Sequence, residues 1–210
     1  PVEHQAGQPI PTLRYVGTLK DSVDCKILDA FDNECEPGQI GEICVRPRNP
    51  WELTLGYWNQ PQATADAFRN LWFHSGDSGY VDTDNGMYFV DRVSDSMRRR
   101  GENISSIEVE GIVNQHSDVL ESAAFPVWAD ESEQEVMITV TTRTGCSLDP
   151  AALLRFLNER MPYFMVPRYV DVVDEIEKTP TGKMRKHKLR DRGVTASTWD
   201  RVAAGVKLER

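Results

Sequence analysis

The chain has 210 residues and carries 33 acidic side chains against 24 lysines and arginines, which gives a formal net charge of −9. That length permits one or two domains with cores of their own, and the acidic balance argues against nucleic acid as a partner, because a phosphate backbone is bound by a basic surface. No apolar run approaches the roughly 18 residues of a membrane-spanning helix, and the four cysteines show no Cys-x-x-Cys pair or metal-ligand spacing, so we expect reduced thiols, a cytoplasmic location and no metal site.

The amino-terminal part of the chain has the alternation of β-strands. Val23, Cys25 and Ile27 alternate with polar neighbours, and Ile43 and Val45 do the same after a turn-rich segment. These residues predict half-buried strands of a small β-rich unit.

A short helix and a hairpin are expected next. The helix is predicted at 61–68, because proline suits the first turn of a helix. Residues 79–81 and 87–90 predict two strands that are joined through the Asn-Gly turn at 82–86.

Beyond residue 93 the periodicity changes. Ser105 and Glu108 fit a capping box, and the apolar stripe behind them predicts a helix to about His116. Residues 119–128 and 135–143 are then predicted as strands.

A second helix is predicted from its cap. Asp149 suits the N-cap position and Pro150 the first turn. The buried face of this helix is expected to consist of Leu153, Leu154, Leu157 and Met161. With a third strand at 169–173, the fold class is α+β: a β-rich segment to about residue 93, followed by an α+β domain.

One lysine near the carboxyl end is a candidate functional residue. Lys183 follows a turn that contains Pro180 and Gly182. Such a turn fixes the place of the side chain that follows it, and an ammonium there can lie between two anions. A surface turn followed by a solvated basic helix has the same pattern, so both interpretations remain open on this evidence.

Five motifs precede this lysine in a fixed order. They read GQIGEICVR at 38–46, GYWNQPQAT at 56–64, WFHSGDSGY at 72–80, DR at 91–92 and RGENI at 100–104. In order and spacing they closely resemble the carboxyl-terminal third of the adenylate-forming enzymes, which include acyl-CoA synthetases, luciferases and the adenylation domains of peptide synthetases. The resemblance extends from about Val23 to Arg190.

The resemblance implies a domain organisation. Residues 1–93 are expected to be the carboxyl-terminal, β-rich part (a distorted barrel) of a large ATP-binding domain, 94–96 a hinge, and 97–210 a small mobile α+β domain. The phosphate loop and the Thr-Glu motif of such enzymes are not in this sequence, so we expect a fragment that is inactive alone.

The resemblance also implies nucleotide-binding residues. Asp77 would bind the ribose of ATP, since a carboxylate offers two acceptors to two hydroxyl donors, and Arg92 would serve the same nucleotide. An ordinary turn at Asp77, or an ion pair of Arg92 with Asp91 or Asp95, is the alternative. His74 is expected to be a packed or surface histidine without a role.

Ser94 stands where relatives carry the hinge residue, which is often Asp or Lys, and its small side chain should still permit rotation. The loop behind it would enter the active site for thioester formation and contact coenzyme A; it consists of Arg98, Arg99, Arg100, Gly101, Glu102 and Asn103. Most relatives have Gly-Gly where this chain has Arg100-Gly101. The three arginines could meet the phosphates of coenzyme A or form a solvated loop.

Lys183 resembles the lysine that contacts the α-phosphate and the attacking carboxylate during adenylation. The cations after it, Arg185, Lys186, Lys188 and Arg190, are expected to be solvated.

The implied activity is that of an AMP-forming carboxylate–CoA ligase, with ATP and Mg²⁺, coenzyme A and a carboxylic acid as reactants. Ser94, the Arg98-Arg99 pair and residues 101–105 look most like the crotonobetaine/carnitine-CoA ligase branch. The alternatives are an adenylation domain that loads a carrier protein, and a non-catalytic module that binds coenzyme A or a partner.

Overall fold

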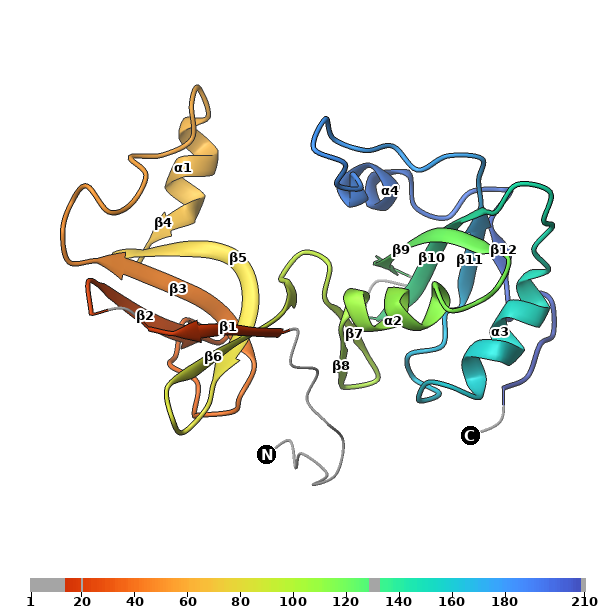
Figure 1. The fold of residues 1–210 in the computed structure, drawn as a ribbon, viewed down its shortest axis with the longest axis horizontal. Coiled ribbons are helices and arrows are strands. Elements are labelled where there is room, and N and C mark those ends of the chain that lie inside the picture. The colour runs from red at the N-terminus through yellow and green to blue at the C-terminus, as the bar shows by residue number, and fades with distance from the viewer. Residues whose placement is uncertain (1–13, 20, 129–132, 209–210) are drawn as a thin grey trace. The chain divides into compact units, whose positions relative to one another are not determined.

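The computed structural model describes residues 14–19, 21–128 and 133–208, and the chain divides into two compact units, residues 1–94 and residues 95–210 (Figure 1). The predicted ranges 1–93 and 97–210 also take in residues 1–13, 20, 129–132 and 209–210, which lie outside the described part. Both units combine strands with helices, so the predicted α+β class is confirmed.

The first unit is built on one antiparallel sheet. Its elements are β1 (Tyr15–Thr18), β2 (Val23–Leu28), β3 (Gly41–Pro47), α1 (Pro61–Ala67), β4 (Phe68–Arg69), β5 (Trp72–Val81) and β6 (Gly86–Arg92). The strand order is β1-β6-β5-β3-β2, with β4 on β5. Within the described residues β1 and β2 do not pair with each other, so the sheet is open and the expected distorted barrel is wrong in that respect. The barrel was expected from the resemblance alone. Whether a sheet closes into a barrel depends on the register of its strands, which the motifs do not determine.

The predicted hairpin is confirmed, with a longer first strand. β5 begins at Trp72, inside the motif at 72–80, rather than at Gly79. At the turn, Asp82 Oδ1 accepts hydrogen bonds from the backbone N–H groups of Asp84 (2.9 Å) and Gly86 (2.7 Å). This side chain thus stabilises the turn that the Asn-Gly pair predicted.

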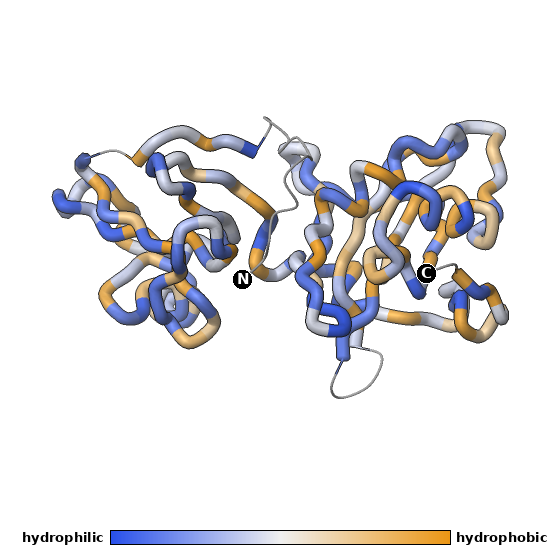
Figure 2. The backbone as a smooth tube through the Cα atoms, turned by 90° about the horizontal axis from the view of Figure 1, so that it is seen from below, coloured by the Kyte–Doolittle hydropathy of each residue, from blue (hydrophilic) through white to orange (hydrophobic). Residues whose placement is uncertain are grey.

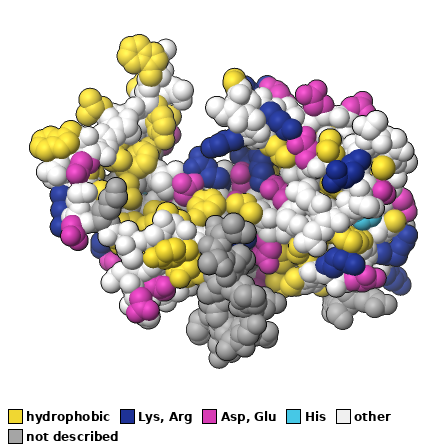
Figure 3. All heavy atoms as spheres, viewed as in Figure 1, with side chains coloured by type: hydrophobic (Ala, Val, Ile, Leu, Met, Phe, Trp, Pro, Cys, Tyr) yellow, Lys and Arg dark blue, Asp and Glu magenta, His cyan; other side chains and the backbone are white. Residues whose placement is uncertain are grey.

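Large apolar side chains are exposed around α1. The exposed fraction is 98% for Leu55, 95% for Trp58 and 86% for Leu71. Figure 3 shows hydrophobic side chains on the outer surface of this part of the first unit. Within the described residues this apolar surface is uncovered, and it contributes nothing to the core.

The second unit combines a mixed sheet with three helices in its described part. Its elements are β7 (Met97–Arg99), β8 (Glu102–Ile104), α2 (Ser106–Val113), β9 (Val119–Trp128), β10 (Gln134–Thr142), α3 (Pro150–Asn158), β11 (Tyr169–Val172), α4 (Lys186–Arg192) and β12 (Trp199–Asp200). The sheet order is β12-β11-β10-β9, with β10 parallel to β11 and antiparallel to β9. β7 and β8 form a separate hairpin.

The sheet of the second unit is covered on both faces. Ala124 and Ile138 point into a core with α2 and α3. Phe125 and Met137 point to the opposite face, where Leu189 of α4 packs. Because neighbouring strand residues point to opposite faces, the apolar runs of β9 and β10 fit a sheet that is buried on both sides.

The predicted helices of this unit are confirmed, but one cap is wrong. Asp149 accepts hydrogen bonds from the N–H groups of Ala151 (3.0 Å) and Ala152 (3.2 Å) at the start of α3. Ser105 occupies the N-cap position of α2, yet its side chain makes no capping hydrogen bond. The predicted capping box is therefore not formed.

The carboxyl-terminal tail contains an element that the sequence did not indicate. Trp199 pairs with Val170, and Asp200 with Tyr169, so that β12 becomes an edge of the sheet. The two residues of β12 are too few to show an alternating pattern.

Hydrophobic segments are short and interrupted along the backbone (Figure 2). Within the described residues, no helix is both long and apolar enough to span a membrane.

Candidate functional site

The predicted ribose-binding motif lies on a bulge in β5. In the β3–β5 ladder Glu42 pairs with Ser78, and the next pair after a register shift is Cys44 with His74. Between these two pairs β5 has three residues where β3 has one. Residues 75–77 therefore leave the ladder, as in a β-bulge, which re-aims a side chain.

Side chains replace the ladder hydrogen bonds that the bulge loses. Gly76 has a φ of 71°, which favours glycine, and its N–H donates to Glu42 Oε1 (3.0 Å). The Asp77 N–H donates to Ser75 Oγ (3.1 Å), and Ser75 Oγ donates to the Ile43 carbonyl (2.7 Å). On the side of β3, the conformation of the bulge is thus fixed by Glu42 and Ser75.

The β5–β6 ladder brings the two predicted nucleotide residues together. Asp77 pairs with Arg92 across β5 and β6. Arg92 Nη1 lies 2.5 Å from Asp77 Oδ1 and 3.4 Å from the Ser75 carbonyl oxygen. Both side chains remain accessible, at 35% for Asp77 and 56% for Arg92. Sequence reasoning considered Asp91 and Asp95 as ion-pair partners of Arg92 and missed Asp77, because that pairing depends on the strand register.

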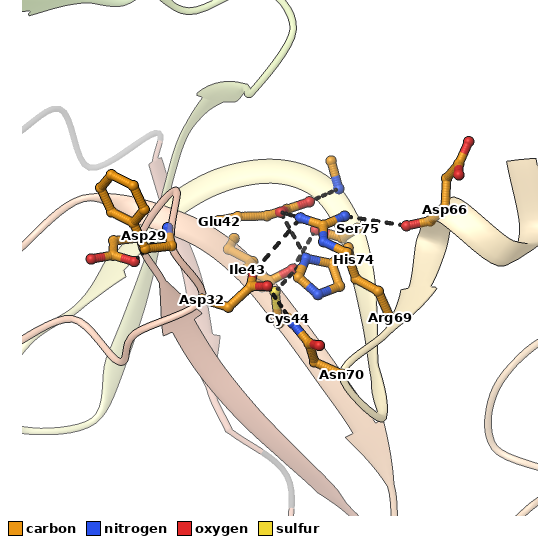
Figure 4. A network of polar contacts seen from close by, with 12 residues as sticks. Asp29, Asp32, Glu42, Ile43, Cys44, Asp66, Arg69, Asn70, His74 and Ser75 are labelled. Carbon is orange, nitrogen blue, oxygen red and sulfur yellow. Dashed lines mark hydrogen bonds and ion pairs between the residues drawn. The ribbon is translucent and has the colours of Figure 1, made fainter.

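A partly buried polar network of Glu42, His74 and Arg69 supports the bulge (Figure 4). His74 is 5% exposed, and its Nδ1 lies 2.8 Å from Glu42 Oε2. Because a carboxylate only accepts, the proton of this hydrogen bond belongs to Nδ1. Arg69 Nη2 donates to the same Glu42 oxygen at 3.1 Å. The prediction that His74 is a packed histidine is confirmed, while Glu42 was missed; an acid inside the apolar strand pattern at 38–46 was its only signal.

Cys44 completes this network as a neutral group. Its Sγ lies 3.3 Å from His74 Nδ1. Burial, together with the charge of Glu42, raises the pKa of the Cys44 thiol to about 12. Cys44 is therefore protonated at neutral pH.

The proposed hinge lies where the two units join. Ser94 is exposed and ends the first unit, and Asp95 begins the second. Asp95 accepts a hydrogen bond from Arg190 of α4, and Lys186 Nζ lies 3.8 Å from its other oxygen. The start of the second unit is thus attached to α4 by two cations.

The loop predicted for the thioester step is the turn of the β7–β8 hairpin. Arg100 has a φ of 54° and Gly101 a φ of 85°, so both central residues are left-handed, as in the preferred two-residue hairpin turns. The Arg100 N–H donates to Glu133 Oε1 (2.9 Å). The Arg100 guanidinium lies 5.6 Å from the centre of the Tyr163 ring. Arginine thus occupies a position that favours glycine.

Several of the predicted loop residues border one hollow. Arg98, Glu102 and Asn103 are exposed. The hollow is lined by Arg98, Arg100, Gly101, Trp128, Glu133 and Gln134. Two guanidinium groups beside an indole can bind phosphate and an aromatic base.

Arg99 contradicts both interpretations of the arginine run. Its side chain is 1% exposed, so it is neither solvated nor available to a phosphate. Arg99 Nε lies 2.8 Å from Glu135 Oε2, and Nη1 donates to the carbonyls of Phe164 (3.0 Å) and Val166 (3.1 Å). Burial lowers the pKa of this guanidinium, and Glu135 opposes that effect. Because β7 packs against the sheet, this strand turns Arg99 inward and Arg98 outward.

Lys183 lies on a turn with internal hydrogen bonds. The N–H of Thr179 donates to the Lys183 carbonyl (2.7 Å), and the N–H of Lys183 donates to Thr179 Oγ1 (3.1 Å). Gly182 has the positive φ of 82° that this turn needs. The Lys183 side chain is exposed.

The cations that follow Lys183 have carboxylate partners. The pairs are Arg185–Glu177, Lys186–Glu110, Lys188–Glu177, Arg190–Asp95 and Arg192–Asp171. The prediction that Arg185, Lys186, Lys188 and Arg190 are solvated holds for Lys188, which is 49% exposed. It is wrong for Lys186, which is 14% exposed and lies 2.6 Å from Glu110. Leu189 packs α4 onto the sheet and so brings its cations close to the acids. Within the described residues, Lys183 takes part in no ion pair.

Comparison with known proteins agrees with these motifs. Residues 108–183 match the family model of the AMP-binding enzyme C-terminal domain. The chain is 38% identical over 160 residues to a probable CoA ligase, CCL9, of Humulus lupulus, a match that covers 76% of this chain and 30% of that protein. It is 36% identical over 176 residues to a long-chain-fatty-acid–CoA ligase of Escherichia coli O157:H7, which covers 84% of this chain and 31% of that protein.

A solved structure shares the fold. It is the o-succinylbenzoate CoA synthetase from Bacillus subtilis in complex with its acyl-adenylate intermediate, with a TM-score of 0.70 and 27% identity over 86% of this chain and 36% of that one. The chain thus spans about a third of the length of the proteins it matches. It belongs to the adenylate-forming superfamily, and residues 108–183 are its AMP-binding enzyme C-terminal domain.

Proposed function

We propose that this chain is part of an ATP-dependent carboxylate–CoA ligase. The enzyme would form an acyl adenylate with release of pyrophosphate, and would then transfer the acyl group to the thiol of coenzyme A with release of AMP. The observation that carries the proposal is Lys183, whose exposed ammonium follows a hydrogen-bonded turn and has no carboxylate partner within the described residues.

Lys183 is assigned to the first half-reaction. There a carboxylate oxygen attacks the α-phosphorus of ATP, and the bond from phosphorus to the pyrophosphate oxygen breaks. Both reactants are anionic, so an ammonium between them reduces their repulsion and stabilises charge in the transition state. A lysine already paired with a carboxylate, such as Lys186, would first have to lose that partner.

Asp77 and Arg92 are assigned to the nucleotide. The Asp77 carboxylate can accept hydrogen bonds from the two ribose hydroxyls. Arg92 orients that carboxylate through the contact at 2.5 Å and has further donors for ribose or phosphate oxygens. The accessible positions of Asp77 on the bulge and of Arg92 at the end of β6 support this assignment.

The β7–β8 turn is assigned to the second half-reaction. Arg98 and Arg100 border the hollow beside Trp128 and would contact the phosphates of coenzyme A. Arg99 takes no part in binding, because it is buried. A hinge at 94–96, with Ser94 as its first residue, would allow residues 97–210 to rotate and present Lys183 and this turn in succession.

The substrate is proposed as a carboxylic acid, with Mg²⁺ accompanying ATP and the reaction taking place in the cytoplasm. The motifs at 94–105 suggest carnitine or crotonobetaine, whereas the names of the matching proteins point to long-chain fatty acids and o-succinylbenzoate.

The test is AMP release by the intact parent protein. ATP, Mg²⁺ and a panel of these acids would be supplied with and without coenzyme A. Release that requires both an acid and coenzyme A is the expected result. Pyrophosphate exchange followed by acyl transfer to a carrier protein alone would instead indicate a carrier-loading enzyme, and no reaction with any acid would contradict the ligase.

A further inference from the structure

Beside the predicted ribose site lies a partly buried acid, Glu42, to which the proposed reaction gives no task. We propose that Glu42 is a positioning residue for nucleotide binding: held by His74 and Arg69, it fixes the bulge that presents Asp77 to the ribose. This inference rests on the proposed function. It adds to the proposed site residues that contact neither the nucleotide nor the carboxylic acid substrate.

The two carboxylate oxygens of Glu42 contact different groups. Oε1 accepts the Gly76 N–H at 3.0 Å, and this N–H belongs to the residue before Asp77. Oε2 accepts from His74 Nδ1 at 2.8 Å and from Arg69 Nη2 at 3.1 Å. One oxygen therefore contacts the bulge, while the other is fixed by two donors.

Glu42 and Ser75 hold the bulge on its β3 side, where residues 75–77 have left the ladder. On the other side, the Gly76 carbonyl accepts a hydrogen bond from the Val93 N–H (2.9 Å) and Asp77 pairs with Arg92 of β6. Gly76 has the widest conformational freedom of any residue. Without Glu42, the Gly76 N–H would lose its acceptor, and a rotation of the Ser75–Gly76 peptide would displace the neighbouring Asp77 side chain. Burial strengthens the contacts of Glu42, whose side chain is 16% exposed, because the local dielectric constant is low.

A bound metal ion does not account for this cluster. Glu42, Cys44 and His74 place their ligand atoms within 4.8 Å of one another, but Arg69 lies 3.1 Å from the same Glu42 oxygen and would repel a cation. Cys44 would also have to lose a proton against a pKa raised by burial to about 12, whereas metals bind the thiolate.

The test uses the intact parent enzyme and compares ATP with 3′-deoxy-ATP. The ratio of the two kcat/KM values reports the contact between Asp77 and the ribose, and it does not depend on the folded fraction of a preparation. In the unaltered enzyme we expect a ratio of about 10 or more, the usual effect of losing a hydrogen bond to a charged group.

Glu42→Gln is the main variant, because it keeps the shape but replaces one acceptor by a donor that faces another donor. We expect the ratio to fall toward unity. His74→Leu should act in the same way, and His74→Asn should largely restore the ratio, since its amide N–H stands near the place of Nδ1. Glu36→Gln, at an exposed acid of the same unit, is the matched control and should leave the ratio unchanged.

The double variant Glu42→Gln/Asp77→Ala separates positioning from general stability. If Glu42 acts through Asp77, it has no further effect on the ratio once Asp77 is absent. A normal ratio in Glu42→Gln, even at reduced activity, would overturn the positioning role. The positioning role would also be overturned if the purified enzyme contained one equivalent of zinc and if removal of that zinc had the same effect as Glu42→Gln. A normal ratio in Asp77→Ala would instead show that the proposed ribose contact itself is wrong.

Discussion

Arg99 provides the sharpest test of how the β7–β8 hairpin is built. Replacing it by methionine removes the cation that faces Glu135, a residue only 9% exposed, and leaves the Phe164 and Val166 carbonyls without their donor. The side chain of methionine still fills most of the apolar space. The effect should therefore be electrostatic and should fall on stability.

The magnitude follows from the burial of both partners. Breaking a buried ion pair by removing one member costs about 3–5 kcal/mol, because the remaining charge is left without compensation. The lower figure, about 3 kcal/mol, suits this pair, since its groups approach within 2.8 Å without the alignment of a hydrogen bond. For a unit of this size, that corresponds to a decrease in Tm of about 12 °C.

Differential scanning calorimetry of the 210-residue chain would measure the change. Arg98→Met, on the outer side of the same strand, is the matched control and should shift the free energy of unfolding by no more than about 0.5 kcal/mol. The double variant Arg99→Met/Glu135→Leu should recover most of the loss, since a buried pair replaced by apolar groups is often neutral. If Arg99→Met and Arg98→Met had equal effects, the buried pair would not be what holds the hairpin.

Three further predictions concern other sites. Arg100→Gly should stabilise the second unit by about 1 kcal/mol in urea unfolding, because glycine has no conformational penalty at the φ of 54°. The same variant should raise the KM for coenzyme A, and an unchanged KM would remove Arg100 from the proposed site. Lys186→Met should cost about 2 kcal/mol in the same assay, because Glu110 loses a partner at 2.6 Å in a partly buried place; a loss no larger than that of Lys188→Met would refute this. Iodoacetamide at pH 8 should modify the exposed Cys146 and spare the buried Cys44, because burial raises the pKa of the Cys44 thiol to about 12. Mass spectrometry of peptides would identify the modified cysteine, and rapid modification of Cys44 would contradict its burial.

Local patterns were sufficient for α3 and for the long strands β9 and β10 of the second unit. Asp149 and Pro150 marked the start of α3, and the leucine stripe marked its buried face. β9 was predicted at its observed bounds, 119–128. In these segments the local propensity of the residues and the periodicity of the apolar side chains both agree with the burial that the fold imposes.

The remaining features depend on partners that are distant in sequence. Arg99 is buried because Glu135 and two carbonyls meet it there, and nothing next to it distinguishes it from Arg98. The contact of Asp77 with Arg92 depends on the register between β5 and β6, which shifts between Ser78 and Gly79 and which the pattern of a single strand does not reveal. Lys186 has the sequence context of a solvated cation, and only the position of α4 beside Glu110 gives it a carboxylate partner.

The proposed role of Lys183 in adenylate formation can be measured by following the two half-reactions separately in the intact parent enzyme. Lys183→Ala should lower ATP–pyrophosphate exchange by about 100- to 1000-fold, while thioester formation from supplied acyl adenylate should continue largely unchanged. Lys188→Ala, whose residue is paired with Glu177, is the control and should leave both steps intact. Equal loss of both half-reactions in Lys183→Ala would contradict the account.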